Sequence, residues 1–235
     1  QREPKGSETA FIDMGLNNLF AVVTTAGDAV IVKGDVIKAE YFRGKGEART
    51  LQSVRDTLRK LDVATWREYH YKYLKSVFKT HERLRHLYRT AVRFLAEWLY
   101  ERGVKRVYMG YPYMITQDNG SEYNTNIWWY RKLALWLHDT LQEYGIELLL
   151  TPEFKTSVEC SICHVEHNGA RVHRGLYVCG KTGRKLNADL NAANNIAHRA
   201  GYRVAVKKIE SYKVTHNGVK PVTPSRRGVA RDPSI

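Results

Sequence analysis

The chain has 235 residues, of which 43% are hydrophobic and 11% aromatic. This length and composition allow a sizeable buried core and exclude a minimal peptide. The 38 lysines and arginines exceed the 24 aspartates and glutamates, so the formal net charge is +14 at pH 7. Such a charge favours a polyanionic partner, nucleic acid above all, although a basic soluble protein without such a partner is the alternative.

Membrane and secreted proteins are both disfavoured. No apolar run approaches the about 18 residues of a membrane span, and the first residues, "QREPKGSETA", lack the apolar centre of a signal peptide. We therefore expect no membrane partner and a cytoplasmic, intracellular location, nucleoid-associated if the source is prokaryotic. Because the sequence starts at Gln1 and not at methionine, we also expect a fragment or a processed piece.

The first part of the chain predicts strands and then helices. Residues 8–42 contain three β-branched and aromatic runs separated by "GLNN" and "AGD", which predicts three antiparallel strands, the first ending at Asp13. Apolar residues then recur three or four positions apart in residues 47–61 and 74–99. This spacing predicts two amphipathic helices, the second ending at Gly103.

The middle of the chain predicts an α/β fold. Residues 104–112 and 145–152 are expected to be strands, with a helix over residues 127–144 between them, and such a βαβ unit implies parallel strands. A last helix is expected in "ADLNAANNIAHRAG", ending at Gly201. Residues 202–235 carry eight lysines and arginines against two acids, so we expect a mostly disordered tail that binds nucleic acid or is merely solvated.

Three cysteines lie within twenty residues, Cys160, Cys163 and Cys179. Their odd number and close spacing are not those of a disulfide framework, and the C-x2-C pair is typical of a zinc ribbon in a reducing compartment. Zinc held by four Cys and His ligands would stabilise a hairpin that has little core of its own.

Two aspartates are candidate ligands for catalytic metal ions. Two divalent cations need several carboxylates that converge from different elements. Asp13 ends the first strand, and Gly15 lets the backbone turn away from it. Asp189 lies near the start of the last helix, where small residues such as Ala192 allow close packing on a sheet. Each has an ordinary alternative, a turn cap for Asp13 and a helix cap or dipole charge for Asp189.

The order of these motifs resembles a known family. "FIDMGLNN", then "GYPYMITQDNG", "EFKTSVECSIC" and "NADLNAANNI" are similar to the RuvC-like nuclease domain of the TnpB family, over roughly residues 8 to 200. These proteins are transposon-encoded, RNA-guided endonucleases related to type V CRISPR effectors and Fanzor proteins. The resemblance implies an RNase H-like fold, a DNA target, a guide RNA, and an Asp, Glu, Asp triad with Mg²⁺ or Mn²⁺.

The resemblance also implies a domain division. We expect residues 8–158 to form the first part of the RuvC-like domain, residues 159–184 an inserted zinc ribbon, and residues 185–201 the final helix of the domain, before the tail of residues 202–235. In this family much of the guide and target recognition lies N-terminal to the part that begins here at Gln1.

The middle member of the triad departs from the family pattern. Asp13 matches the first member and Asp189 the last, but the usual glutamate position holds Gly110, which cannot bind a metal. Glu153, at the end of the next strand, is our preferred replacement, because some members such as Fanzors have a relocated glutamate. Asp118 and Glu122 are further candidates, and an inactive site without any replacement is the alternative.

The fourth zinc ligand is also unusual. The family pattern has a second C-x2-C pair, but Cys179 is followed three positions later by Thr182, a poor zinc ligand. We predict His167 as the fourth ligand, so the set is Cys160, Cys163, His167 and Cys179. His164 is adjacent to Cys163 and has less freedom, His173 lies in the arm of the hairpin, and a metal-free ribbon is the alternative.

The favoured hypothesis is an RNA-guided DNA endonuclease that uses two-metal catalysis. The alternative is a nuclease-inactive, RNA-guided DNA-binding protein of repressor type, and a junction resolvase on the same fold is disfavoured by the ribbon. The oligomeric state is left open. Basic residues four apart on the predicted long helix would neutralise nucleic-acid phosphates or form an ordinary solvated face: Lys75, Lys79 and Arg83, and Arg85, Arg89 and Arg93.

Overall fold

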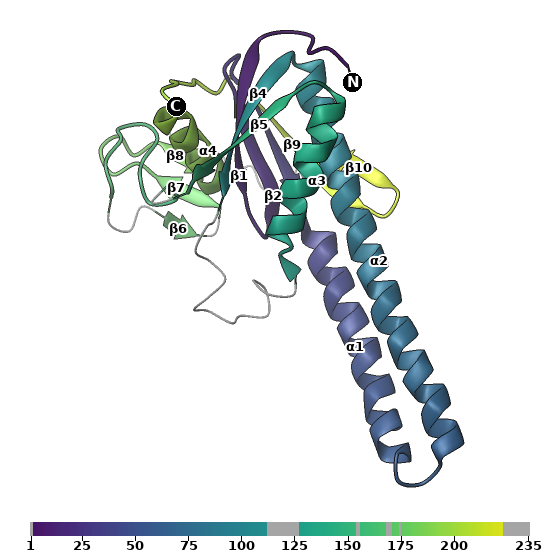
Figure 1. Cartoon of the computed structure of the whole chain (residues 1–235). Helices are drawn as coiled ribbons and strands as arrows, with labels where there is room; N and C mark the ends of the chain where they lie inside the picture. Colours follow the sequence, from purple (N-terminus) through teal and green to yellow (C-terminus); the bar gives the residue numbers. More distant parts are fainter. Residues whose placement is uncertain (1, 112–126, 154–155, 168–170, 174, 223–235) are drawn as a thin grey trace.

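The computed structural model describes residues 2–111, 127–153, 156–167, 171–173 and 175–222. It is a mixed α/β structure in which a seven-stranded sheet has the strand order β10-β9-β3-β2-β1-β4-β5, and a second sheet has the order β6-β7-β8 (Figure 1). Two long helices, α1 and α2, extend away from the large sheet as a hairpin (Figure 1). The small sheet lies next to α4, on the side of the large sheet opposite to α2 and α3 (Figure 1).

The first three strands form the predicted antiparallel meander. They are β1 (Glu8–Met14), β2 (Asn18–Thr24) and β3 (Asp28–Lys33). β1 pairs with β2, and β2 with β3, both antiparallel. Their β-branched and aromatic residues are buried on both faces, as expected for strands covered by helices on either side.

The helical hairpin consists of α1 (Asp35–Leu58) and α2 (Val63–Glu101). Both helices were predicted, but α1 begins much earlier than residue 47, and the expectation of strand structure as far as residue 42 is wrong. The physical reason is the helix pairing. Glu40 is buried and forms ion pairs with Arg43 on α1 and Arg83 on α2.

The predicted βαβ unit is confirmed. β4 (Val104–Tyr111) pairs in parallel with β5 (Glu147–Pro152), and α3 (Tyr130–Glu143) lies between them in sequence. β4 also pairs in parallel with β1, so β4 lies between β1 and β5. Gly103 has a φ of +67°, which suits a glycine that ends a helix and turns into a strand.

The two faces of the large sheet carry separate cores. Ala10, Ile12, Val107 and Met109 pack in the core formed with α2 and α3. Phe11, and Tyr108 beside it, pack with α4 (Ala188–Arg199) on the other face. Because successive side chains of a strand alternate between faces, Asp13 on β1 and Gly110 on β4 lie on the α4 face.

The tail expectation is wrong for residues 208–221. These residues form β9 (Lys208–Thr215), parallel to β3, and β10 (Gly218–Pro221), antiparallel to β9. Parallel pairing with β3 depends on distant residues, which local composition cannot reveal. Residues 223–235 lie outside the described part of the chain.

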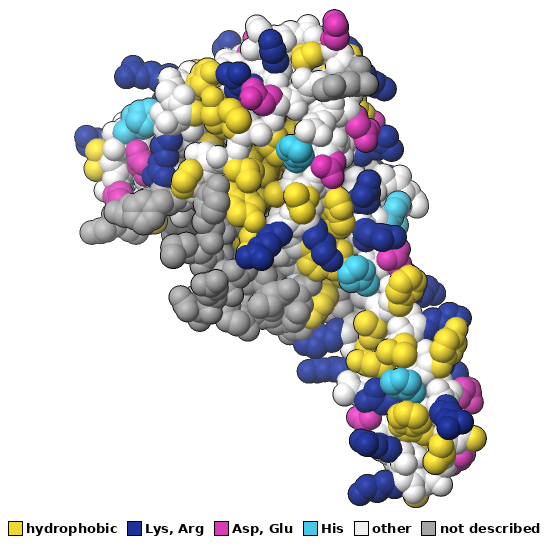
Figure 2. Space-filling view, viewed as in Figure 1, with side chains coloured by type: hydrophobic (Ala, Val, Ile, Leu, Met, Phe, Trp, Pro, Cys, Tyr) yellow, Lys and Arg dark blue, Asp and Glu magenta, His cyan; other side chains and the backbone are white. Residues whose placement is uncertain are grey.

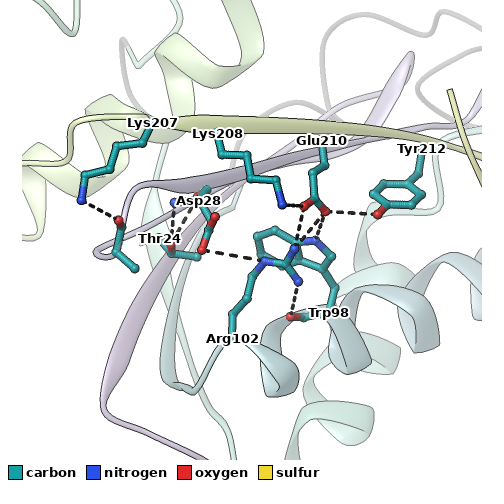
Figure 3. A network of polar contacts seen from close by, with 9 residues as sticks. Thr24, Asp28, Trp98, Arg102, Lys207, Lys208, Glu210 and Tyr212 are labelled. Carbon is teal, nitrogen blue, oxygen red and sulfur yellow. Dashed lines mark hydrogen bonds and ion pairs between the residues drawn. The ribbon is translucent and has the colours of Figure 1, made fainter. Parts of the chain in front are cut away.

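Glu210 attaches this added hairpin to α2 (Figure 3). Its carboxylate accepts hydrogen bonds from Trp98 Nε1 at 3.0 Å and from Arg102 at 2.9 Å, and it pairs with Lys208 at 2.7 Å. Burial opposes ionisation of this carboxyl, but the hydrogen bonds from Lys208 and Trp98 and the charge of Arg102 outweigh it and lower the pKa of Glu210 to about 2. The ionised form therefore stabilises the fold at neutral pH.

The small sheet comprises β6 (Arg171–His173), β7 (Leu176–Val178) and β8 (Lys185–Asn187), which runs directly into α4.

Figure 2 shows lysine and arginine side chains along the helical hairpin, with apolar side chains between them. The exposed apolar residues of the hairpin include Leu61, Tyr71, Leu74 and Phe78. Every helix in the described ranges falls short of the combined length and apolar character that crossing a membrane requires.

Candidate functional site

Asp13 and Asp189 line one cleft. Its volume is about 340 Å³, and its walls come from the end of β1, the β1–β2 turn and the first turn of α4, with Ser157 and Gly175 at its edge. α4 packs against β1 and β2, and this contact carries Asp189 towards the end of β1. Two acids that are 176 positions apart in the sequence therefore reach the same cavity.

Local hydrogen bonds fix Asp189. The side chain of Asn187 caps α4 by accepting hydrogen bonds from the backbone N–H groups of Asp189 and Leu190, at 3.0 and 3.1 Å, so Asp189 itself is not the cap. Asn18, the first residue of β2, donates from Nδ2 to Asp189 Oδ2 at 2.5 Å. The sequence did not identify Asn18, although its place in "GLNN", five positions after Asp13, was a usable signal.

Glu153 lies beside Gly110. In the pairing of β4 with β5, Gly110 is opposite Thr151, and Glu153 follows two residues later on the same face. A Cβ atom placed on Gly110 would meet Glu153 Cγ at 2.7 Å, Glu153 Oε1 at 2.8 Å and Ile196 Cδ1 at 2.7 Å. The glutamate side chain thus fills the space above Gly110, next to Ile196 of α4, and any larger residue at position 110 would displace it.

The carboxyl group of Glu153 is largely buried. Its Oε1 atom has no hydrogen-bond partner among the described residues. Burial raises the pKa of Glu153 to about 7, because the charged form loses its hydration. A proton or a cation at this carboxyl would remove that cost.

The register between β1 and β4 determines where Asp13 and Gly110 lie along their strands. Ile12, directly before Asp13, pairs with Met109, directly before Gly110. Asp13 and Gly110 therefore end neighbouring strands at the same edge of the sheet and on the same face. Glu153 is not among the residues that line the cleft of Asp13 and Asp189. Among the described residues, the three acids also do not form a group whose ligand atoms all lie within 4.8 Å of one another.

The four predicted zinc ligands do come together. The ligand atoms of Cys160, Cys163, His167 and Cys179 all lie within 4.8 Å of one another. Cys163 Sγ is 2.9 Å from His167 Nε2 and 3.8 Å from Cys179 Sγ. Tetrahedral zinc with bonds of about 2.3 Å to sulfur would place two sulfurs about 3.8 Å apart. The ligand types and this sulfur–sulfur distance therefore suit a tetrahedral zinc site.

Two neighbours accommodate His167 beside the cysteines. A Cβ atom on Gly180 would lie 3.0 Å from Nδ1 of His167, so glycine at this position lets the imidazole approach the cysteines. Thr182, at the place of the family's fourth cysteine, hydrogen-bonds to Cys179 and lowers the pKa of that thiol to about 6. A lower thiol pKa favours the thiolate that binds a metal.

A second group of metal-binding side chains lies next to the ribbon. The ligand atoms of Glu159, His164 and His198 also lie within 4.8 Å of one another. However, the two imidazole rings are stacked at 3.8 Å with only 18° between their planes, so their in-plane nitrogen lone pairs do not point at one position. Glu159 also pairs with Arg199 at 3.5 Å, and the group is therefore not a formed metal site.

The other residues considered as possible metal ligands are Asp118, Glu122, His164 and His173. Asp118 and Glu122 lie outside the described residues, so the structure says nothing of them. His173 belongs to β6, and the structure does not describe its side chain. His164 belongs to the second group and not to the cysteine cluster.

Family models match most of the chain. Residues 1–116 match the family described as "Probable transposase", and residues 130–196 match "Cas12f1-like, TNB domain". The chain is 35% identical over 223 residues to the TnpB-like protein ORF457 of Acidianus two-tailed virus, covering 94% of this chain and 48% of that protein. It is also 35% identical over 81 residues to the CRISPR-associated endodeoxyribonuclease Cas12f1 of Sulfoacidibacillus thermotolerans, covering 34% of this chain and 19% of the relative.

Solved structures share the fold. A Cas12f1–sgRNA–target DNA complex matches with a TM-score of 0.63 at 20% identity, covering 83% of this chain and 40% of that one. A CRISPR–Cas12f ternary complex matches with a TM-score of 0.65 at 21% identity, covering 82% and 39%. The chain spans about half the length of its viral relative, at 48%. Together, the family matches, the viral relative and the shared fold show that this chain belongs to the TnpB family.

Proposed function

We propose that this chain is the RuvC-like, RNase H-fold part of an RNA-guided DNA endonuclease that hydrolyses phosphodiester bonds with divalent metal ions. The observation that carries the proposal is the position of Glu153, whose side chain fills the space above Gly110. The family's missing glutamate is in this view relocated from the end of β4 to the end of β5.

Three acids would hold Mg²⁺ or Mn²⁺: Asp13, Glu153 and Asp189. They come from three elements: Asp13 and Glu153 lie at one edge of the sheet on the face covered by α4, and Asp189 lies in the first turn of α4, an arrangement that suits convergent carboxylate ligands. Bound ions in such sites activate a water for in-line attack and stabilise the leaving oxygen. The donor set fits, since all three side chains supply oxygen ligands and Glu153 Oε1 has no hydrogen-bond partner among the described residues.

The chain's own contribution is to orient the acids. Asn18 holds one oxygen of Asp189, which fixes the direction of the carboxylate's other oxygen. Ile196 and the backbone of Gly110 confine Glu153. Because Glu153 must lose its proton to bind a cation and its pKa is about 7, metal binding would release a proton and become tighter as the pH rises through neutrality.

Guide RNA and target DNA are the proposed partners. The relative Cas12f1 is named as an endodeoxyribonuclease, and a solved relative is a complex with sgRNA and target DNA. The net charge of +14 and the basic side chains along the helical hairpin (Figure 2) suit a sequence-independent attraction to phosphates. Several basic residues of α2 also serve the fold, as Arg83 does by pairing with Glu40.

Zinc in the ribbon is the second proposed metal. Three cysteines and His167 form a closed set of four ligands, typical of a structural and not a catalytic zinc site. We propose the division expected from the sequence, with the RuvC-like domain in residues 8–158 and 185–201 and the ribbon in residues 159–184.

A cleavage assay tests the proposal. Single-stranded DNA and guide-matched duplex DNA are incubated with the purified protein, with and without guide RNA, in Mg²⁺ or Mn²⁺. We expect metal-dependent products from the wild type and none from Asp13→Ala, while both bind DNA equally. Glu153→Gln should behave like Asp13→Ala. Cleavage that survives both substitutions would refute the assigned site.

The second candidate is a nuclease-inactive, RNA-guided DNA-binding protein. Gly110 at the family's glutamate position is the observation that favours it, together with the absence of Glu153 from the residues lining the cleft. For such a protein, the wild type and Asp13→Ala would bind guide and target alike, and neither would give a metal-dependent product.

A further inference from the structure

Two buried asparagines of α4 bind the chain segment that joins Glu153 to the ribbon. Asn195 donates from Nδ2 to the backbone oxygens of Thr156 and Glu159, at 2.8 and 2.7 Å. Asn191 donates from Nδ2 to the oxygen of Glu159 at 2.7 Å and accepts at Oδ1 from the N–H of Ser161 at 2.8 Å. Both asparagines are only 1% exposed.

The same segment is tied back to Glu153. The backbone N–H and the side-chain hydroxyl of Thr156 both donate to the backbone oxygen of Glu153, at 3.2 and 3.1 Å. Thr156 is itself buried, at 3% exposure. A continuous set of hydrogen bonds therefore runs from Glu153 through Thr156 to Asn195 on α4.

In the other direction the segment enters the zinc ribbon. Ser161 follows the buried Cys160, and the backbone N–H of Cys160 bonds to the oxygen of Val165 within the first knuckle. Asn191 thus holds the chain directly beside the first cysteine. Asn191 and Asn195 are four positions apart, so they project from one side of the helix, while Asp189 faces the cleft.

Buried backbone oxygens need hydrogen-bond partners. Here the partners are the side-chain amide groups of Asn191 and Asn195, on the helix that carries Asp189. We infer that Asn191 and Asn195 are positioning residues that hold Glu153 and the first zinc knuckle at a fixed place relative to Asp189. The inference rests on the proposed metal-dependent nuclease. It means that the ribbon and the acid site form one connected unit, with the asparagine amides as the connection.

Asparagine-to-aspartate variants test the amide chemistry without a change in size. Asn195→Asp removes the two donated hydrogen bonds and places an anion against two carbonyl oxygens. Asn194→Asp is the matched control on the same helix, because it introduces the same charge one residue away, and Asn194 Oδ1 has no hydrogen-bond partner among the described residues. Asn191→Asp is the second variant, which retains the acceptor and loses the donor.

Three measurements separate positioning from general stability. Hydrogen–deuterium exchange of the peptide covering residues 156–161 measures how firmly Asn191 and Asn195 hold this segment, a set of contacts called the clamp below. Calorimetric titration with Mn²⁺ measures the affinity of the acid site for metal, and zinc analysis measures the metal content of the ribbon. For Asn195→Asp we expect faster exchange in that peptide and at least tenfold weaker Mn²⁺ binding. The zinc content, the exchange of the β1–β3 core and the KM for DNA should stay as in the wild type, while the Mg²⁺ concentration for half-maximal cleavage rises.

The outcomes are distinguishable. If Asn195→Asp matches Asn194→Asp in exchange and Mn²⁺ affinity, the inference is wrong. If Asn195→Asp does not fold, Asn191→Asp is judged by the same two measurements. If the wild type binds Mn²⁺ but cleaves no DNA, the proposed nuclease fails, and the clamp is still accepted or rejected on exchange and Mn²⁺ affinity.

Discussion

The buried carboxyl of Glu153 makes the stability of the metal-free protein depend on pH. Its pKa is raised by burial from 4.5 to about 7, so the folded state favours the protonated form. The sign follows directly. The carboxyl imposes no cost below pH 4.5, the unfolded-state value, and an increasing cost as the pH rises towards 7, above which the cost is constant.

The size of the effect follows from the shift. Each pKa unit corresponds to about 1.4 kcal/mol, so the full shift would cost about 3 kcal/mol at pH 8 and less than about 1 kcal/mol at pH 5. We therefore expect the wild type to lose about 2 kcal/mol of unfolding free energy between these pH values through this group alone. Glu153→Gln, which cannot ionise, should lack this loss.

Urea denaturation at pH 5 and pH 8, in buffer that retains zinc and contains neither Mg²⁺ nor Mn²⁺, measures the difference. Glu153→Gln should be more stable than the wild type by about 3 kcal/mol at pH 8 and by less than about 1 kcal/mol at pH 5. Other titrating groups cancel in the comparison, and Glu143→Gln, at an exposed position of α3, is the matched control. Equal stability of Glu153→Gln and the wild type at pH 8 would refute the buried, raised-pKa carboxyl.

Three further predictions concern the scaffold. Metal analysis should find one zinc per chain, and His167→Ala should lower that content and increase protease cleavage within the ribbon, whereas unchanged zinc would exclude this ligand. Glu210→Gln should lower stability at pH 7 by about 1 to 2 kcal/mol, an effect present above pH 4.5 and lost as the pH falls towards the Glu210 pKa of about 2; equal thermal denaturation curves at pH 7 would contradict this. Gly44→Ala should destabilise the helical hairpin by about 1 to 2 kcal/mol, because the new Cβ would lie 2.2 Å from Thr80 Oγ1. Gly46→Ala, on the same helix with no atom within 4 Å of its new Cβ, should instead be neutral or stabilising by up to about 1 kcal/mol in the same urea denaturation, and equal effects of the two changes would contradict the packing argument.

Local sequence patterns predicted the parts of the fold that local interactions determine. The β-branched and aromatic runs separated by "GLNN" and "AGD" indicated the meander, and the spacing of apolar residues indicated the long helix and the helix of the βαβ unit. The start of α1 could not be predicted, because Glu40 reads as an ordinary surface acid until its pairing with Arg83 of α2 is known. The same is true of β9, whose strand character depends on pairing with β3.

The approach of His167 to the three cysteines and the approach of Asp13 to Asp189 were predictable for different reasons. His167 was chosen because it lies in the first knuckle, four residues after Cys163, whereas His164 is adjacent to Cys163 and has less freedom, and the structure brings it to the cysteines. Asp13 and Asp189 were recognised from motifs whose order along the chain is specific to the family. The contact of Glu153 with Gly110 needed coordinates, because it depends on the parallel register of β4 and β5.

Moving the glutamate back to β4 tests the central claim most directly. The variant Gly110→Glu/Glu153→Ala/Ile196→Val places the acid at the family position and removes the two side-chain atoms that a Cβ at position 110 would meet first. Its background is Glu153→Ala/Ile196→Val. The account predicts that Mg²⁺-dependent DNA cleavage is lost in the background and returns in the variant with the acid at position 110. Full cleavage by the background protein, or no recovery in a variant that folds and binds Mn²⁺, would contradict it.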